Sequence, residues 1–326
     1  MIKQMNKSKK SSAILYLSAV GMLLCTQAVL SAEAPADWFE RMSAAMQKMN
    51  YAGTVIRTKG GDAEALKVVR SVDDGVINEK VTVQEGNGLE IIRSGNEVRC
   101  ILPDQKSVLV ETWNNQSTLF SALPDSSVRF GHEYDLSLVR EERVAGRKAV
   151  LLAIRPHDEF RFGHRIWLDQ RTGFPLKTEL VGGDGSLLEQ VKFADINLES
   201  SISPDALSPS VSIENFTFHA GNAERIEIDV ETDWECSDLP AGFRVVSTKN
   251  EQLPGADMPV THILYSDGLA SVSVFIARLQ KSKAPRRSNI GGSNAYSLQQ
   301  DEYRITAVGE VPAATSKRIA ISMRQK

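Results

Sequence analysis

The sequence predicts a mainly β (α+β) protein with two domains, preceded by an export segment. Three observations lead to this prediction. The N-terminus runs from basic to apolar to small residues, short β-rich segments alternate with Gly, Asn and Asp turns, and a Ser/Pro-rich stretch interrupts them at residues 200–212. A chain of 326 residues is long enough for two domains of ordinary size.

The first 32 residues have the order expected of a secretory signal peptide. The basic residues come first: Lys3, Lys7, Lys9 and Lys10. The uncharged, mostly apolar run 13–25 follows, and it is shorter than the ~20 residues that a membrane-spanning helix needs. We expect cleavage after Ala32, because a cut after Ala34 would place Pro35 at the new N-terminus. A transmembrane anchor is the alternative interpretation.

Cys25 raises the question of a lipoprotein, but Leu24 stands where a lipidated cysteine needs a small residue. We therefore expect Cys25 to leave with the signal. Removing the four signal-peptide lysines from 38 basic residues against 41 acidic ones leaves a net charge of about −7. No dense basic face remains, so we expect no nucleic-acid binding. The remaining cysteines, Cys100 and Cys236, could form a disulfide or stay as two free thiols.

The first predicted element of the mature chain is an amphipathic helix over residues 36–50. Its apolar residues recur at spacings of three and four: Phe39, Met42, Met46 and Met49. The simplest interpretation is a helix packed on a core. The alternative is an adaptable apolar face beside a lipid-like ligand.

The segments after residue 51 predict an antiparallel meander, because strands follow one another with short polar turns. The expected strands are 54–58, 66–70, 81–84, 91–93, 98–102, 107–112, 136–144, 149–155, 161–168, 176–180 and 187–193. About ten such strands tend to curl or close. The alternation breaks at 114–129, where Leu119, Phe120 and Leu123 suggest a short helix against the sheet.

The Ser/Pro-rich composition predicts a linker at 200–223 between a first domain, 33–199, and a second, 224–326. The second domain has strand candidates at 225–230, 243–248, 262–266, 272–277 and 303–308. A final helix is expected over 313–323, with Pro312 at its entry.

The chain shows no motif for catalysis or for a metal site. Its five histidines have no His-x-x-x-His spacing, its cysteines no Cys-x-x-Cys pair, and no serine lies in a Gly-x-Ser-x-Gly elbow. We therefore expect no catalytic residues, no metal, no cofactor and no enzymatic activity. The basic stretch that ends in Arg286 and Arg287 is either a solvated loop or a site for an acidic partner segment or a phosphorylated lipid head group.

Several motifs in order resemble those of one protein family. The run from Trp167 through Gly173 to Gln190 is similar to lipoprotein-sorting-like domains. The later runs 239–243, 264–269 and 308–312, followed by the 317–320 part of the last helix, resemble the RseB/MucB family of periplasmic regulators of sigma-E (AlgU). The resemblance covers essentially the whole mature chain.

The resemblance implies a fold, a partner and a mechanism. The first domain would be an unclosed antiparallel β-barrel around helices, similar to LolA and LolB, and the second a small antiparallel sheet with a helix. Family members bind the periplasmic part of an anti-sigma factor, RseA or MucA, and shield it from the site-1 protease. Lipid or lipopolysaccharide is thought to release it. The implied localisation is the periplasm.

These considerations give specific expectations for residues. We expect Arg286, Arg287, Tyr265 and Asp267 to contribute to binding the partner or a lipid head group. An apolar groove would be lined by Phe39, Met42, Met46 and Phe120. A periplasmic lipid or lipoprotein carrier is the second hypothesis and an envelope hydrolase the third. The sequence does not identify the lipid that is sensed. It also leaves open whether the protein forms a homo-oligomer.

Overall fold

A computed structural model describes residues 33–112, 119–120, 123, 132–198, 201–220, 231–251, 259–279 and 286–326. The predicted signal peptide lies outside them. Residues Ala34–Lys326 form one compact unit. This unit contains two sheets with separate apolar cores, which we call the first lobe (34–220) and the second lobe (231–326).

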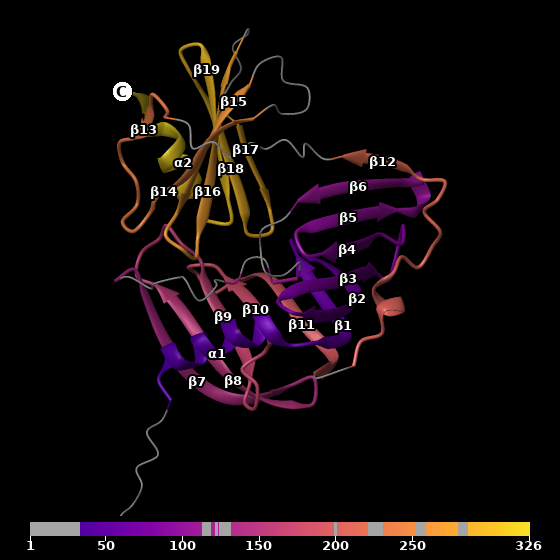
Figure 1. The fold of residues 1–326 in the computed structure, drawn as a ribbon. Helices are drawn as coiled ribbons and strands as arrows, with labels where there is room; N and C mark the ends of the chain where they lie inside the picture. The colour runs from indigo at the N-terminus through magenta and orange to yellow at the C-terminus, as the bar shows by residue number, and fades with distance from the viewer. Residues whose placement is uncertain are drawn as a thin grey trace, which may run out of the picture. The chain divides into compact units, whose positions relative to one another are not determined.

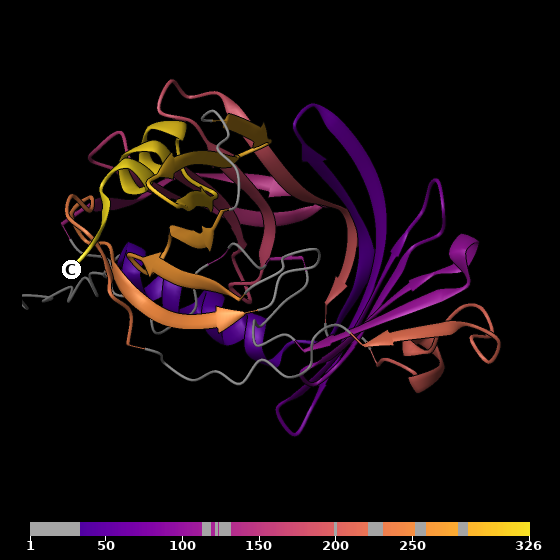
Figure 2. The same ribbon diagram turned by 90° about the horizontal axis from the view of Figure 1, so that it is seen from above.

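The helix α1 (Pro35–Lys48) begins the first lobe, close to the predicted range. Pro35 occupies the first turn, where its missing N–H costs nothing, and the Asp37 carboxylate accepts a hydrogen bond from the Ala34 N–H at 2.9 Å. The apolar stripe of the helix is buried against the sheet. Figures 1 and 2 show α1 lying along one face of the curved sheet.

The first lobe is one open sheet of twelve strands. The strands are β1 (Tyr51–Lys59), β2 (Asp62–Asp73), β3 (Val76–Val83), β4 (Glu90–Ser94), β5 (Glu97–Leu102), β6 (Ser107–Thr112), β7 (Tyr134–Val144), β8 (Arg147–Pro156), β9 (Gly163–Asp169), β10 (Pro175–Val181), β11 (Leu187–Leu198) and β12 (Thr217–Ala220). Their order is β12-β6-β5-β4-β3-β2-β1-β11-β10-β9-β8-β7, with β7 and β12 at the edges (Figure 1). This confirms the expected unclosed, mainly antiparallel sheet.

Tight turns set the register of the meander. Asp74 and Gly75 connect β2 to β3 with φ of 48° and 82°, so both central residues are left-handed, as in the hairpin turns whose twist matches the strands. The pairing then places Arg70 opposite Glu79. These two charged side chains are buried beside α1, where the Arg70 guanidinium donates to Glu79 at 3.3 Å and to the Met46 carbonyl at 2.5 Å.

Two predicted segments of the first lobe have a different structure. Leu119 and Phe120 are not helical, yet both are buried in the core, and most of the segment predicted as a short helix lies outside the described residues. The interval predicted as a linker contains a 3-10 turn, η2 (Pro204–Leu207), and β12, which pairs in parallel with β6. The Lys80 ammonium holds this interval through the Ser208 carbonyl and the Ser210 hydroxyl, both at 2.7 Å. The division into domains stays a prediction.

The second lobe is a six-stranded sheet covered by a helix. Its strands are β14 (Arg244–Glu251), β15 (Val260–Ser266), β16 (Ser271–Arg278), β17 (Arg286–Ile290), β18 (Ser293–Gln300) and β19 (Tyr303–Gly309), in the order β14-β15-β16-β19-β18-β17. The helix α2 (Ala313–Ile321) packs on β18 and β19. Two short strands, β13 (Trp234–Cys236) and β20 (Met323–Gln325), form a separate pair.

Several local predictions for the second lobe need correction. Arg286–Ile290 is a strand paired with β18, so the loop interpretation of this part of the basic stretch is wrong. The last helix ends at Ile321, and Met323 begins β20. The strand predicted at 225–230 lies outside the described residues. Cys100, in the first lobe, and Cys236, in the second, are both free thiols.

Candidate functional site

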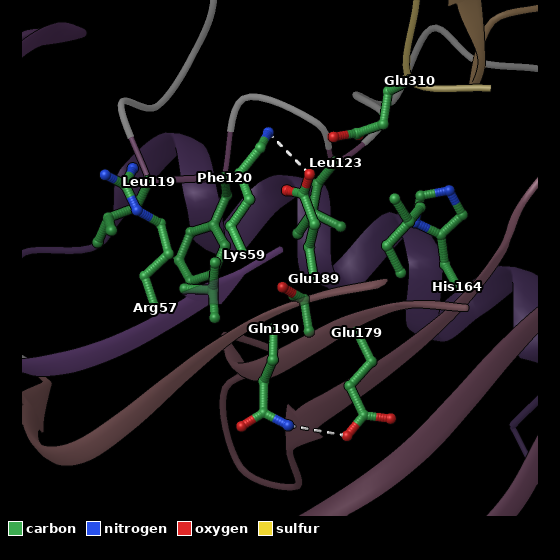
Figure 3. A pocket seen from close by; sticks show the side chains of 13 residues that line it. Arg57, Lys59, Leu119, Phe120, Leu123, His164, Glu179, Glu189, Gln190 and Glu310 are labelled. Carbon is green, nitrogen blue, oxygen red and sulfur yellow. Dashed lines mark hydrogen bonds and ion pairs between the residues drawn. The ribbon is translucent and has the colours of Figure 1, made fainter. Parts of the chain in front are cut away.

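A cavity of about 170 Å³ lies in the first lobe, where four neighbouring strands inside the sheet begin or end (Figure 3). Leu119, Phe120 and Leu123 form its apolar side. Its remaining lining residues come from four neighbouring strands and from the second lobe: Arg57, Lys59, His164, Thr178, Glu179, Leu180, Glu189, Gln190, Val191 and Glu310.

Strand register explains why these residues meet. Lys59 on β1 pairs with Glu189 on β11, Glu189 pairs with Leu180 on β10, and Leu180 pairs with His164 on β9. Directly paired residues of an antiparallel sheet point to the same face, so the four side chains form one row across four strands. Residues far apart in sequence thereby form one wall of the cavity.

Charges are concentrated at the end of this row. The Lys59 ammonium lies 2.7 Å from Glu189 Oε1, which also accepts the Gly292 N–H of the second lobe at 3.0 Å. The Glu310 carboxyl is half-buried beside Glu189. Burial first, and then the negative charge of Glu189, raises the pKa of Glu310 to about 7. Burial lowers the pKa of His164 to about 4, so its ring is neutral at pH 7.

A second group of polar side chains joins the lobes through Arg161, which precedes β9. The Arg161 side chain is 0% exposed, and its Nε donates to Asp267 Oδ2 at 2.5 Å. The same guanidinium pairs with Asp158 and donates to the Ala241 carbonyl. Its carbon atom lies 5.5 Å from the ring centre of Tyr134. We call this group the Arg161 cluster.

The Tyr134 hydroxyl completes the Arg161 cluster by donating to Asp267 at 2.8 Å. Burial, followed by the Asp267 charge, raises the pKa of Tyr134, so the phenol stays protonated. The other carboxylate oxygen of Asp267 accepts the N–H groups of Leu269 and Ala270, at 2.9 and 2.7 Å. Asp267 therefore closes its own hairpin turn and binds the first lobe at the same time.

The residues predicted to line an apolar groove are packed in the core of the first lobe. Phe39, Met42 and Met46 are 5%, 0% and 6% exposed and belong to one apolar cluster with Phe120. Phe120 also contacts the cavity. The helix α1 is therefore packed on the core, as in the simplest interpretation of the sequence. The role of these residues in ligand binding stays a prediction.

The residues predicted to bind a partner or head group fall into two sets. Tyr265 is 1% exposed, and its hydroxyl lies 3.7 Å from the Met323 sulfur, while Asp267 is engaged in the Arg161 cluster. Arg286 and Arg287 are exposed on β17, and the Arg287 guanidinium lies 5.6 Å from the Tyr296 ring centre. Only the two arginines are thus available to a partner in this structure; their role stays a prediction.

Sequence reasoning gave no role to Arg161, Glu189 or Glu310. Glu310 belongs to the 308–312 motif, and Arg161 is flanked by Phe160 and Phe162, an unusual place for a buried cation. Neither feature identifies the side chain that Glu310 or Arg161 contacts in the folded protein. Within the described residues no group of His, Cys, Asp and Glu side chains is suited to a metal ion. The helices α1 and α2 of the described residues, with 14 and 9 residues, are shorter than the ~20 apolar residues of a membrane-spanning helix.

The fold and the cavity define a two-lobed β protein whose second lobe contributes Glu310 to a small cavity of the first. The chain belongs to the MucB/RseB family. The profile of the MucB/RseB N-terminal domain matches residues 34–211, and that of the MucB/RseB C-terminal domain matches residues 229–324.

Named relatives agree with this assignment along nearly the whole chain. The sigma factor AlgU regulatory protein MucB of Pseudomonas aeruginosa is 31% identical over 314 residues, 94% of this chain and 96% of the relative. The sigma-E factor regulatory protein RseB of Escherichia coli is 26% identical over 305 residues, 93% and 95% of the two chains.

Solved structures show the same fold. A structure of MucB in complex with MucA(peri) superimposes with a TM-score of 0.70 at 31% identity, covering 90% of this chain and 99% of that one. The Pseudomonas aeruginosa MucA/MucB complex gives a TM-score of 0.71 at 30% identity, with the same coverage.

Proposed function

We propose that this protein is a periplasmic, non-enzymatic regulator that binds the periplasmic part of a MucA- or RseA-like anti-sigma factor. The observation that carries the proposal is the similarity to MucB across both lobes, together with the solved complex of MucB with MucA(peri). Binding would shield the anti-sigma factor from the site-1 protease, and so keep sigma-E (AlgU) inactive.

We propose a separate binding role for each of the two predicted domains. The second domain (224–326), aided by the linker 200–223, would hold the anti-sigma segment, and the first domain (33–199) would bind lipid or lipopolysaccharide. The exposed Arg286 and Arg287 support the first assignment, since arginine side chains grip carboxylates and phosphates in bidentate fashion. The apolar side of the cavity, formed by Leu119, Phe120 and Leu123, supports the second.

The size of the cavity places a condition on lipid binding. About 170 Å³ is less than the roughly 300–1,000 Å³ of ordinary ligand pockets, so an acyl chain requires the cavity to widen. Each buried CH₂ contributes about 0.8 kcal/mol, so about ten of them, as in one acyl chain, match the roughly 8 kcal/mol of a micromolar protein–protein contact. Lipid then releases the partner only if it binds the free regulator more tightly than the complex.

A reconstituted cleavage assay tests the proposal. The mature protein is mixed with the periplasmic anti-sigma segment and the active site-1 protease, with and without lipopolysaccharide. We expect the protein to slow cleavage and lipopolysaccharide to restore it. Cleavage at an unchanged rate in the presence of saturating protein excludes the regulator and leaves the lipid carrier as the hypothesis to pursue.

A further inference from the structure

The turn between β17 and β18 is built to fit against the end of the first sheet. Gly292 is buried, and its N–H donates to Glu189 at 3.0 Å. A Cβ on Gly292 would lie 2.3 Å from a methyl carbon of Leu180, and one on Gly291 would lie 2.7 Å from both Glu189 Oε1 and Lys59 Cγ. Only glycines allow the backbone of the second lobe to approach these side chains so closely.

Asn294 fixes the same turn to the segment that carries Glu310. Its side-chain amide donates to the Gly292 carbonyl at 3.3 Å and to the Val311 carbonyl at 2.9 Å. The turn and Glu310 therefore approach the first sheet as one piece. Figure 3 shows the Glu310 and Glu189 carboxyl groups at the same end of the cavity.

The two carboxyl groups are close neighbours at this turn, because a Cβ on Gly292 would lie 3.3 Å from Glu310 Cγ and 3.6 Å from Glu189 Oε1. A hydrogen bond between two carboxyl groups requires a proton on one of them. Two ionised carboxylates sharing one site repel, which favours the neutral form of one of them. Lys59 compensates a single negative charge, that of Glu189. Loss of the shared proton leaves a second negative charge beside the first.

The other charged groups around the pair do not remove this imbalance. Arg57, on the same strand as Lys59, is paired with Glu64 at 2.6 Å. On β10, Glu179 is bound by Lys177 at 2.6 Å and by Arg165 at 3.3 Å, and on β9 His164 is neutral at pH 7. The turn between β17 and β18 contributes only glycine backbone here.

We propose that Glu189 and Glu310 form a proton-operated contact between the two lobes. With one proton shared, the contact holds the second lobe against the end of β1 and β11. When the proton leaves, the carboxylates repel and this side of the contact opens, which widens the mouth of the cavity that Glu310 helps to line.

The direction of the pH effect follows from the raised pKa of Glu310. Its ordinary value is 4.5, and burial together with Glu189 raises it to about 7. A carboxyl whose pKa is raised in the folded contact binds the proton more tightly there than elsewhere. It therefore stabilises the contact fully below pH 4.5, and this stabilisation is lost as the pH rises through about 7.

Distance measurement between the lobes tests the contact. Spin labels are attached to Glu85→Cys on the first lobe and Lys317→Cys on α2, both exposed, with Cys100 and Cys236 replaced by serine. The distance between the two labels is measured by double electron–electron resonance from about pH 5.5 to about pH 8.5, a range that brackets the raised pKa of Glu310. We expect one narrow distance at low pH and a shift to longer, broader distances with a midpoint near 7. A second background carries Glu310→Gln, which remains neutral.

The variants separate this pair from every other titrating group. With Glu310→Gln or Glu189→Gln the low-pH distance should persist throughout, because two negative charges can no longer meet. Glu302→Gln, in an exposed ion pair of the same lobe, should follow the wild type. Distances that do not change with pH in the wild type overturn the proposal. So does a shift that survives in both glutamine variants, since it would belong to other groups.

Discussion

Replacing Arg161 with methionine should destabilise the protein through Asp267. The change removes a cation with no exposed surface from a carboxylate whose side chain is 3% exposed. Breaking a buried pair by removing one partner costs about 3–5 kcal/mol. Asp267 keeps the Tyr134 hydroxyl and two backbone N–H groups, so we expect a loss at the lower end, about 3 kcal/mol.

Urea unfolding followed by tryptophan fluorescence measures this loss. Trp167 reports on the first core and Trp234, packed 5.1 Å from the Tyr303 ring centre, reports on the second. Arg278→Met provides a matched control, because its ion pair with Glu302 is 56% and 48% exposed and should contribute about 0–1 kcal/mol.

A double-mutant cycle isolates the pair. Asp267→Asn in the Arg161→Met background removes the uncompensated charge, so the double variant should be at least about 1 kcal/mol more stable than the sum of the single losses predicts. Additive losses, or a loss from Arg161→Met no larger than that from the Arg278 control, would show that the buried pair does not hold the lobes as described.

Three further predictions follow from the same structure. Gly292→Ala should lower the free energy of unfolding by about 1–3 kcal/mol in urea, because the new methyl overlaps a leucine side chain. The neutral His164 ring contributes stability that is present above pH 6.5 and lost as the pH falls to about 4, since the unfolded chain binds the proton first; His164→Gln should flatten thermal stability over that range. Charge reversal at Arg286 and Arg287 should weaken binding of the anti-sigma segment or lipopolysaccharide, measured by calorimetry.

Two of these predictions have a matched control variant, and the third has an outcome that would contradict it. Gly183→Ala, whose methyl meets nothing within 4 Å, should leave stability unchanged. An unaltered slope of stability against pH in His164→Gln would place the acid-sensitive group elsewhere. Arg324→Glu, at an exposed position paired with Glu235, reverses a charge away from β17. Equal affinities for this variant and for the double reversal would argue against a binding role for β17.

The elements of the fold were predictable where local chemistry determines them. The spacing of Phe39, Met42 and Met46 predicts α1, and Asp74-Gly75 predicts the hairpin between β2 and β3. β18 was missed because only two large apolar residues, Tyr296 and Leu298, stand among the Ser, Asn and Gln residues of Ser293–Gln300, and such a polar run after Gly291-Gly292 is typical of a loop.

The candidate site was less accessible to sequence reasoning. Glu189 and Glu310 lie more than a hundred positions apart, and only the register of β1, β10 and β11 and the docking of the second lobe bring them together. Asp267 illustrates the same limit. Its motif was recognised, but its turn-closing position indicates a structural residue, and nothing local reveals that Arg161 binds its other oxygen.

The pairing of β1 with β11 has a consequence for how the chain folds. Tyr51 pairs with Leu198, so the first strand cannot gain its second neighbour until almost the entire first lobe has been made. In a chain that emerges N-terminus first, one edge of β1 therefore stays unpaired, and the apolar face of α1 stays uncovered, until β11 has emerged. Such high contact order slows folding and exposes the intermediate to aggregation. We expect refolding in the range of milliseconds to seconds, and a dependence on chaperones until β11 has emerged.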